Sequence, residues 1–237
     1  MNELPRGTTG LARGAWRGQT GGMNDAWTRR LLLGGVIGPI VFVAGFLVIG
    51  AVRPDYDAAR TFVSQLSLTD QGWQQIANFV VSGALIIGFA VGLRRVLPGS
   101  RWGPILIGAA GVGLVLSGIF LTDPALGYPP GTPEGFPATN SWHATVHYVA
   151  ALLVFAGLPA AAFVLARRFR AEGNRGWATY SMLTAVGMLA AYVLAISGPM
   201  GADALLGVAG VLQRVSAVIG LGWVGQLAWR LWRVRGT

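Results

Sequence analysis

Six long apolar segments constrain the fold of this chain more than any other feature of its sequence. They cover residues 31–52, 74–96, 103–121, 142–166, 177–197 and 206–229. A bilayer core about 30 Å thick is crossed by roughly 20 helical residues, and each segment is about that long. The composition, 53% hydrophobic and only 11% charged, also departs from that of water-soluble domains. We therefore expect an all-α, polytopic membrane helix bundle with six transmembrane helices.

The arginines predict how these spans are oriented. All 18 basic residues are arginines, and 15 of them flank the spans on one side, which is also the side of both chain ends. Because positively charged connections stay in the cytoplasm, both termini should be cytoplasmic. Arginine without lysine, among many Ala and Gly residues, is typical of a GC-rich bacterial genome, so the membrane should be a bacterial plasma membrane. This topology accounts for the basic surplus, so we expect membrane lipids as partners and no nucleic acid.

The chain divides into two expected parts. Residues 1–28 should be a disordered cytoplasmic N-terminal segment, because a Gly-rich polar stretch buries too little apolar surface to offset its ordering entropy. Residues 29–237 should form the six-helix transmembrane domain. The sequence contains no cysteine, which excludes disulfides, thiolate metal sites and cysteine nucleophiles.

Spans two and three resemble spans four and five, which predicts a tandem duplication of a helix hairpin. Landmarks recur in the same order: Trp73 aligns with Trp142, the pair Arg94–Arg95 with Arg167–Arg168, and "DPALG" from Asp123 with "DALLG" from Asp203. The two hairpins would pack as a four-helix core about an axis along the membrane normal.

The only two histidines, His143 and His147, lie four residues apart at the start of the fourth span. In the alignment of the two hairpins they correspond to Gln74 and Asn78. Residues i and i+4 share one helix face, about 6 Å apart along the axis. Each hairpin should therefore begin with a polar pair. Together with the acidic residues that end the partner helices, these pairs predict a polar pocket that opens to the outside.

Three interpretations of the histidine pair remain open. Imidazoles at i and i+4 can chelate one ion, and with Asp123 or Asp203 they would form a zinc site capable of hydrolysis. Haem is the less expected cofactor, because two residues on one helical turn cannot ligate opposite faces of a porphyrin. In the third interpretation, the histidines hydrogen-bond to polar neighbours at a wet helix end or relay protons.

Two long outer loops and one buried charge complete the set of candidates. Residues 53–73 form either a solvated connector or a lid over the polar mouth, and residues 122–143, with five prolines, form either a connector or an ordered cover. Arg214 is placed in the middle of the last span, where an unpaired charge costs about 3 kcal/mol. A carboxylate from another helix or a water-filled cavity is expected beside it. The candidate pocket residues are Asp57, Arg60, Ser64, Ser67, Gln74, Asn78, Asp123, Trp142, His143, His147, Asp203 and Arg214.

Four short stretches together resemble a known family. They are "RPDYDAARTFVSQLS", "TDP", "PATNSWHATVH" and "ARRF", and the sequence resembles over roughly residues 31–229 the bacterial six-span membrane family called domain of unknown function 998. This resemblance implies a six-helix fold and brings no established activity. A fainter likeness, in the outer Ser, Asp and HxxxH set, is to the membrane hydrolases that include alkaline ceramidase. Those enzymes have seven spans and a third histidine.

Two functions are favoured by these features, and permeation is a lesser third option because only Arg214 marks a path through the membrane. The first is a metal-dependent or acid–base enzyme that acts on lipid or cell-envelope material, with His143, His147 and Asp123 in its site. The second is a non-enzymatic protein that binds a lipid, a small molecule or a membrane partner through the same pocket.

Overall fold

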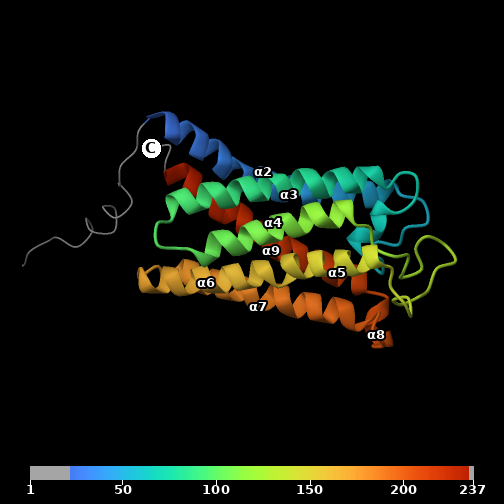
Figure 1. Ribbon diagram of the computed structural model, residues 1–237. Helices are drawn as coiled ribbons and strands as arrows, with labels where there is room; N and C mark the ends of the chain where they lie inside the picture. The colour runs from blue at the N-terminus through green and yellow to red at the C-terminus, as the bar shows by residue number, and fades with distance from the viewer. Residues whose placement is uncertain (1–21, 235–237) are drawn as a thin grey trace, which may run out of the picture.

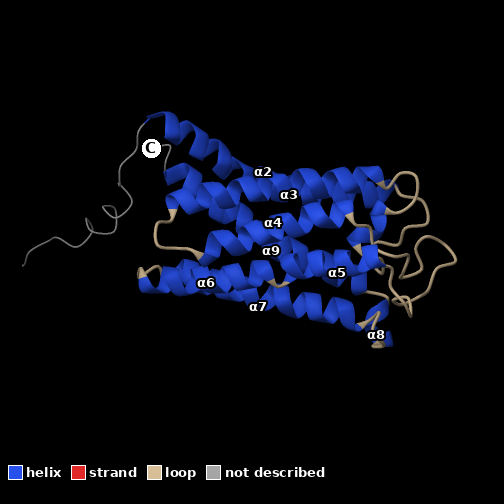
Figure 2. Cartoon of the chain, in the orientation of Figure 1, coloured by secondary structure: helices blue, strands red, loops and turns tan. Residues whose placement is uncertain are grey.

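A computed structural model describes residues 22–234 and shows long helices running side by side (Figure 1). The long helices are α2 (Gly22–Val52), α3 (Trp73–Val96), α4 (Trp102–Ile119), α5 (Trp142–Phe155), α6 (Gly157–Ala171), α7 (Arg175–Ser197) and α9 (Ala209–Val234). Two short helices, η1 (Val63–Ser67) and α8 (Asp203–Leu206), lie in the connections. The described part of the chain contains no strand (Figure 2), so the all-α prediction is confirmed.

Six spans in the described residues are long and apolar enough to cross a membrane, as the sequence predicted. The chain is therefore a multi-pass membrane protein. Helices α5 and α6 form one span, Trp142–Ala171, interrupted at Ala156. Pro159 explains the interruption, because it lacks the N–H that would bond to the Phe155 carbonyl and its ring clashes with that carbonyl.

Helix boundaries differ from the prediction at both ends of the chain. Helix α2 begins at Gly22, ahead of the boundary expected at residue 29, and the remainder of the expected disordered segment, residues 1–21, lies outside the described residues. The last span begins at Ala209 rather than residue 206, because Asp203–Leu206 forms the separate helix α8.

The six spans form a closed ring in the order of the chain. Each span packs against the next one, and α9 returns to pack against α2. Figure 1 shows the red α9 behind α3 and α4, with its end near the blue start of α2. Contacts across the ring, such as those between α3 and α9, are few. The expected separate four-helix core is therefore not seen, because α2 and α9 complete the ring; the duplication itself remains a prediction.

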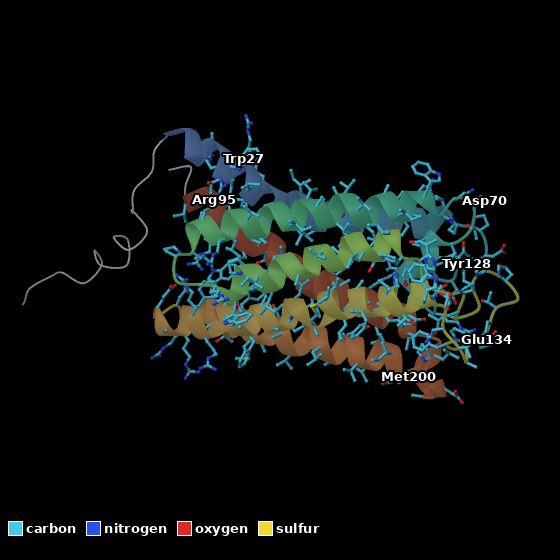
Figure 3. All side chains as sticks on the ribbon, in the orientation of Figure 1. Trp27, Asp70, Arg95, Tyr128, Glu134 and Met200 are labelled. Atoms are coloured by element: carbon cyan, nitrogen blue, oxygen red, sulfur yellow. The ribbon has the colours of Figure 1, made fainter. Side chains whose placement is uncertain are left out.

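The two ends of the bundle hold different connections between the helices. One end, here called the arginine end, holds the α3–α4 and α6–α7 connections and the end of α9; Figure 3 labels Trp27 and Arg95 there. The other, here called the loop end, holds the loops of residues 53–72 and 120–141 together with α8, and Figure 3 labels Asp70, Tyr128, Glu134 and Met200 there.

Candidate functional site

Part of the first long loop is inserted into the loop end of the ring. This inserted segment, residues 58–67, includes η1, whose five residues are all buried. Hydrogen bonds to α9 hold it, among them the Val63 N–H donating to Gln213 Oε1 at 2.8 Å and the Val211 N–H donating to the Ala59 carbonyl at 2.9 Å. The loop is therefore not a solvated connector.

Gly210 allows this segment to approach α9 so closely. A Cβ atom at this position would lie 2.5 Å from the Thr61 carbonyl oxygen, 2.6 Å from that of Ala58 and 2.9 Å from that of Ala59. Contacts this short do not occur for real Cβ atoms, so only glycine fits without moving backbone.

Arg214 anchors the same segment, and this corrects the prediction made for it. It lies in the second turn of α9, near the loop end rather than in mid-span, and no carboxylate among the described residues pairs with it. Its guanidinium donates to the carbonyls of Ala58 (2.6 Å) and Thr61 (2.9 Å) and to the Tyr56 hydroxyl. Backbone carbonyls thus satisfy the charge, and hydrogen bonds to a charged group are the strong kind.

Tyr56 completes this anchor. Its hydroxyl also lies 3.2 Å and 3.1 Å from the carbonyl oxygens of Thr61 and Phe62, and its ring packs edge-on against Tyr128 of the second loop. Burial raises the pKa of the Tyr56 hydroxyl to about 12, although the neighbouring Arg214 charge acts to lower it. The hydroxyl therefore stays protonated at physiological pH.

The second long loop forms an ordered cover beside the inserted segment. Ala125 and Leu126 are buried in a small apolar cluster with Phe62. Asp123 holds the far end of the loop, because its two carboxylate oxygens accept from the Ser141 N–H and hydroxyl, both at 2.7 Å. Since Ser141 is the N-cap of α5, Asp123 orients the start of that helix.

A cavity of about 80 Å³ lies inside the ring beneath the inserted segment. Its wall is mainly apolar and includes side chains of the inserted segment and of all six spans. The apolar lining comprises Phe42, Phe62, Val63, Phe79, Leu114, Phe136, Ala151, Val154, Phe155, Leu158, Met188, Tyr192 (by its ring), Ile196, Ala217 and Leu221. The prediction of a polar pocket is therefore wrong: most of the lining side chains are apolar, and only a few are polar.

These polar groups come mainly from the loop end. They are Ser64, Gln65, Ser117, Thr122, His147, Tyr148 and Gln213. The amide nitrogen of Gln65 donates to the Asp123 carbonyl at 3.1 Å, whereas its carboxamide oxygen has no hydrogen-bond partner among the described residues. Gln65 is only 1% exposed. A buried, unpaired acceptor costs about 1–3 kcal/mol, so this oxygen is a ready acceptor for a ligand or a water in the cavity.

The two histidines occupy different environments. His147 is buried, lines the cavity, and its Nδ1 lies 2.8 Å from the Phe120 carbonyl oxygen at the end of α4. His143 is exposed, with its ring centroid 3.6 Å from that of Trp142, which is itself 64% exposed. With both Asp123 oxygens bonded to Ser141, these residues do not form a ligand set. No three His, Cys, Asp or Glu side chains in the described chain are grouped to hold a metal ion.

The structure does not gather most of the other candidates around the cavity. Of the twelve, only Ser64 and His147 line it. Asn78 is buried, and its amide donates to the Phe42 carbonyl at 3.1 Å. Gln74 accepts from Arg53 at 3.3 Å, and Arg60 forms an ion pair with Glu134.

Three candidates remain to be placed. The exposed Asp57 accepts from the N–H of Ala59 at 2.9 Å, within its own turn. Ser67 is buried in η1, and its hydroxyl has no partner in the described chain. Asp203 is exposed in the first turn of α8.

Sequence reasoning missed the polar residues that matter most at the cavity. Gln65 and Gln213 were overlooked, although each carried a signal. Gln213 is an amide inside an apolar span, and Gln65 lies in "TFVSQLS", where apolar residues interrupt an otherwise polar loop. Such apolar residues in a long loop indicate a segment that packs into the protein.

Comparison with known proteins identifies the family. No curated protein and no solved structure matches the chain. One family model, described as a protein of unknown function (DUF998), matches residues 36–230, which include all six spans in whole or in large part. The chain therefore belongs to the DUF998 family of proteins of unknown function.

Proposed function

We propose that this protein binds an uncharged amphiphilic molecule of the membrane, such as a neutral lipid, in the central cavity. The observation that carries the proposal is the buried, unpaired carboxamide oxygen of Gln65 at the polar end of an apolar cavity. This oxygen offers an acceptor to a hydroxyl or amide of the ligand, and the apolar wall accommodates the carbon chain next to it.

The lining favours an uncharged ligand. Among the described residues, the cavity wall includes no Asp, Glu or Arg, so a charged headgroup inside it would have no counter-charge. The same lining argues against hydrolysis, because no carboxylate is present to orient or assist His147. We therefore favour binding over the enzymatic alternative.

The cavity volume limits what fits without movement. About 80 Å³ is near half of the roughly 150 Å³ cavity known to take up benzene, so without movement it holds only a few heavy atoms, such as a hydroxyl and the carbons next to it. The rest of the chain would leave between α5 and α7, whose backbones make few close contacts, on the loop-end side of the stacked rings of Phe155 and Tyr192. A larger headgroup would require displacement of the inserted segment.

The test is native mass spectrometry of the full chain in a neutral detergent, titrated with monoolein. We expect one monoolein to be retained, and Ala151→Phe, which fills the cavity, to abolish retention. Val149→Phe is the matched control, because Val149 lies two residues away on the same helix with 57% of its surface exposed. Absence of binding by the wild type, or equal binding by the two variants, would refute the proposal.

Gln65→Leu provides a second arm of the same test. It preserves the approximate size of the side chain and removes the free oxygen together with the bond to the Asp123 carbonyl. We expect monoolein binding to weaken by about tenfold, the effect of losing one hydrogen bond of roughly 1.4 kcal/mol. Gln65→Glu, which keeps an oxygen at this place, should weaken binding through its charge only when that carboxyl is ionised.

We further propose that the membrane is a bacterial plasma membrane and that the arginine end faces the cytoplasm. The arginine asymmetry of the sequence supports this orientation. Because the chain has no cysteine, single cysteines at the exposed positions Asp70 and Arg170 can be labelled in intact cells with a membrane-impermeant maleimide. Labelling of Asp70→Cys alone supports the orientation, and labelling of Arg170→Cys alone reverses it.

A further inference from the structure

A second hollow lies at the opposite end of the molecule from the cavity's polar groups. It is a groove of about 480 Å³ at the arginine end, between α7 and the last turns of α9. This size is within the roughly 300–1,000 Å³ range of small-molecule sites. We call it the arginine–tryptophan groove; it is lined by Trp177, Gly225, Gln226, Trp229, Arg230, Arg233 and Val234.

Tryptophan rings hold the two arginines of this groove. The guanidinium of Arg230 lies 4.8 Å from the centroid of the Trp177 ring, and that of Arg233 lies 5.9 Å from the centroid of Trp229. Stacking on a ring leaves the N–H edges of a guanidinium available to hydrogen-bond acceptors. The terminal nitrogens of Arg230 lie 2.7 and 3.2 Å from the side-chain amide of Asn174, whose oxygen is the acceptor there; this amide is neutral, so the charge of Arg230 stays uncompensated. Trp229 is 46% exposed, so one wall of the groove borders the lipid-facing surface.

The positive charge of the groove is not neutralised by the described protein. Glu172, the acid whose charge acts on Arg230, has its own ion pair with Arg168 at 2.7 Å. Neither Arg230 nor Arg233 forms an ion pair with a described carboxylate. A third cation, Arg29 of α2, lies 5.2 Å from the centroid of Trp232, which stacks on Trp229.

We propose that this groove binds the phosphodiester headgroup of an anionic phospholipid. Arg230 and Arg233 pair with the phosphate oxygens, and Trp229 and Val234 contact the glycerol and first acyl carbons at the membrane interface. Arginine suits phosphate because its planar fork makes two parallel hydrogen bonds. Tryptophan is enriched at the headgroup level of membrane proteins, which places the groove where such lipids are. The site is independent of the central cavity, from which it differs in charge and position.

Native mass spectrometry of the full chain in a neutral detergent tests this proposal, with phosphatidylglycerol, phosphatidylcholine and inorganic phosphate as probes. We expect phosphatidylglycerol to bind more tightly than phosphatidylcholine. Arg230→Gln/Arg233→Gln should weaken phosphatidylglycerol binding about tenfold or more, since each arginine contributes to attraction of an anionic lipid. Arg94→Gln/Arg95→Gln is the matched control, because it removes the same charge at the same end of the bundle and should leave this binding unchanged.

Gly225→Leu tests the groove without altering its charge. Only the Gly35 carbonyl oxygen, at 3.9 Å, lies within 4 Å of a Cβ at this position, so a side chain there can be accommodated and would narrow the groove that Gly225 lines. It should weaken phosphatidylglycerol binding as the arginine variant does, and it keeps the test decisive if that variant fails to fold. Equal effects of the two arginine pairs, or undiminished binding by Gly225→Leu, overturn the proposal. If millimolar inorganic phosphate displaces phosphatidylglycerol completely, the occupant of the groove is a free anion and not a lipid.

Discussion

His147 and Asn78 make the same kind of bond at corresponding places in the ring. The Nδ1 of His147, on α5, lies 2.8 Å from the Phe120 carbonyl oxygen at the end of α4. The amide nitrogen of Asn78, on α3, donates at 3.1 Å to the Phe42 carbonyl of α2. Each side chain thus ties its helix to the helix that precedes it. The sequence alignment paired these two residues, so the parallel is what a duplication predicts.

We expect the two histidines to differ in how much they contribute to the free energy of unfolding. His147→Ala leaves the partly buried Phe120 carbonyl without its bond and opens space at the cavity, so we expect a cost of about 2–4 kcal/mol in unfolding free energy. His143→Ala should cost less than about 1 kcal/mol, because the ring is exposed. Thermal unfolding in detergent provides the comparison. A larger loss for His143→Ala would contradict the assignment, as would stoichiometric zinc bound by both histidines.

The anchor between Arg214 and Tyr56 should behave as one coupled unit. Arg214→Met removes donors from two carbonyls of the inserted segment and from the Tyr56 hydroxyl, so this segment should loosen. We expect trypsin to cleave after Arg60 faster than in the wild type, because this residue is only partly exposed when the segment is seated. A double-mutant cycle with Tyr56→Phe should give a coupling energy of about 1–2 kcal/mol. Additive effects would show that the two residues act separately.

Tyr56 should make stability fall in alkaline solution. Burial raises the pKa of its hydroxyl from 10.0 to about 12, so the unfolded chain loses this proton at a lower pH than the folded protein does. The resulting stabilisation is complete below pH 10 and disappears as the pH rises to 12. It amounts to about 2–3 kcal/mol at roughly 1.4 kcal/mol per pKa unit. The free energy of unfolding, measured between these pH values, should decline less steeply in Tyr56→Phe. An identical slope would count against the raised pKa.

Two glycines of α9 should respond in opposite ways to the same substitution. Gly210→Ala places a Cβ within 2.9 Å of three carbonyl oxygens of the inserted segment, and should destabilise the protein by about 1–3 kcal/mol or displace the segment. Gly222→Ala meets no atom within 4 Å and should be neutral or stabilising by up to about 1 kcal/mol. Equal melting temperatures for the two variants would mean that the segment does not seat on Gly210.

The sequence predicted the spans well because membrane length and apolarity are properties of the local chain. The prediction for Arg214 was wrong because the start of its helix depends on a tertiary contact. Residues 205–208 are mostly apolar and continue the pattern of the last span, yet the helix starts only at Ala209, where Gly210 meets the inserted segment. Because the predicted start is misplaced, the sequence puts Arg214 in mid-membrane, beside a carboxylate or a water-filled cavity.

The site was only partly predictable, for a similar reason. The i, i+4 spacing placed His143 and His147 at the start of one helix and could not reveal that only His147 turns to the ring interior. The partners of Asp123 and Gln65 lie in segments that approach one another only through the folded loops. Periodicity describes the face of a helix, whereas these contacts depend on loop conformation.

Closure of the ring by the last helix has a consequence for biogenesis. During synthesis, α2 is inserted first and must wait for α9, which provides the other edge of the ring. The inserted segment also waits, because Gly210, Gln213 and Arg214 all belong to that last helix. A nascent chain with five spans therefore lacks the helix that closes the ring, and its first loop has no helix to pack against. The bundle is complete only once α9 is in place, so a chain that stops before this helix is left as an unsealed membrane protein that quality-control proteases can recognise.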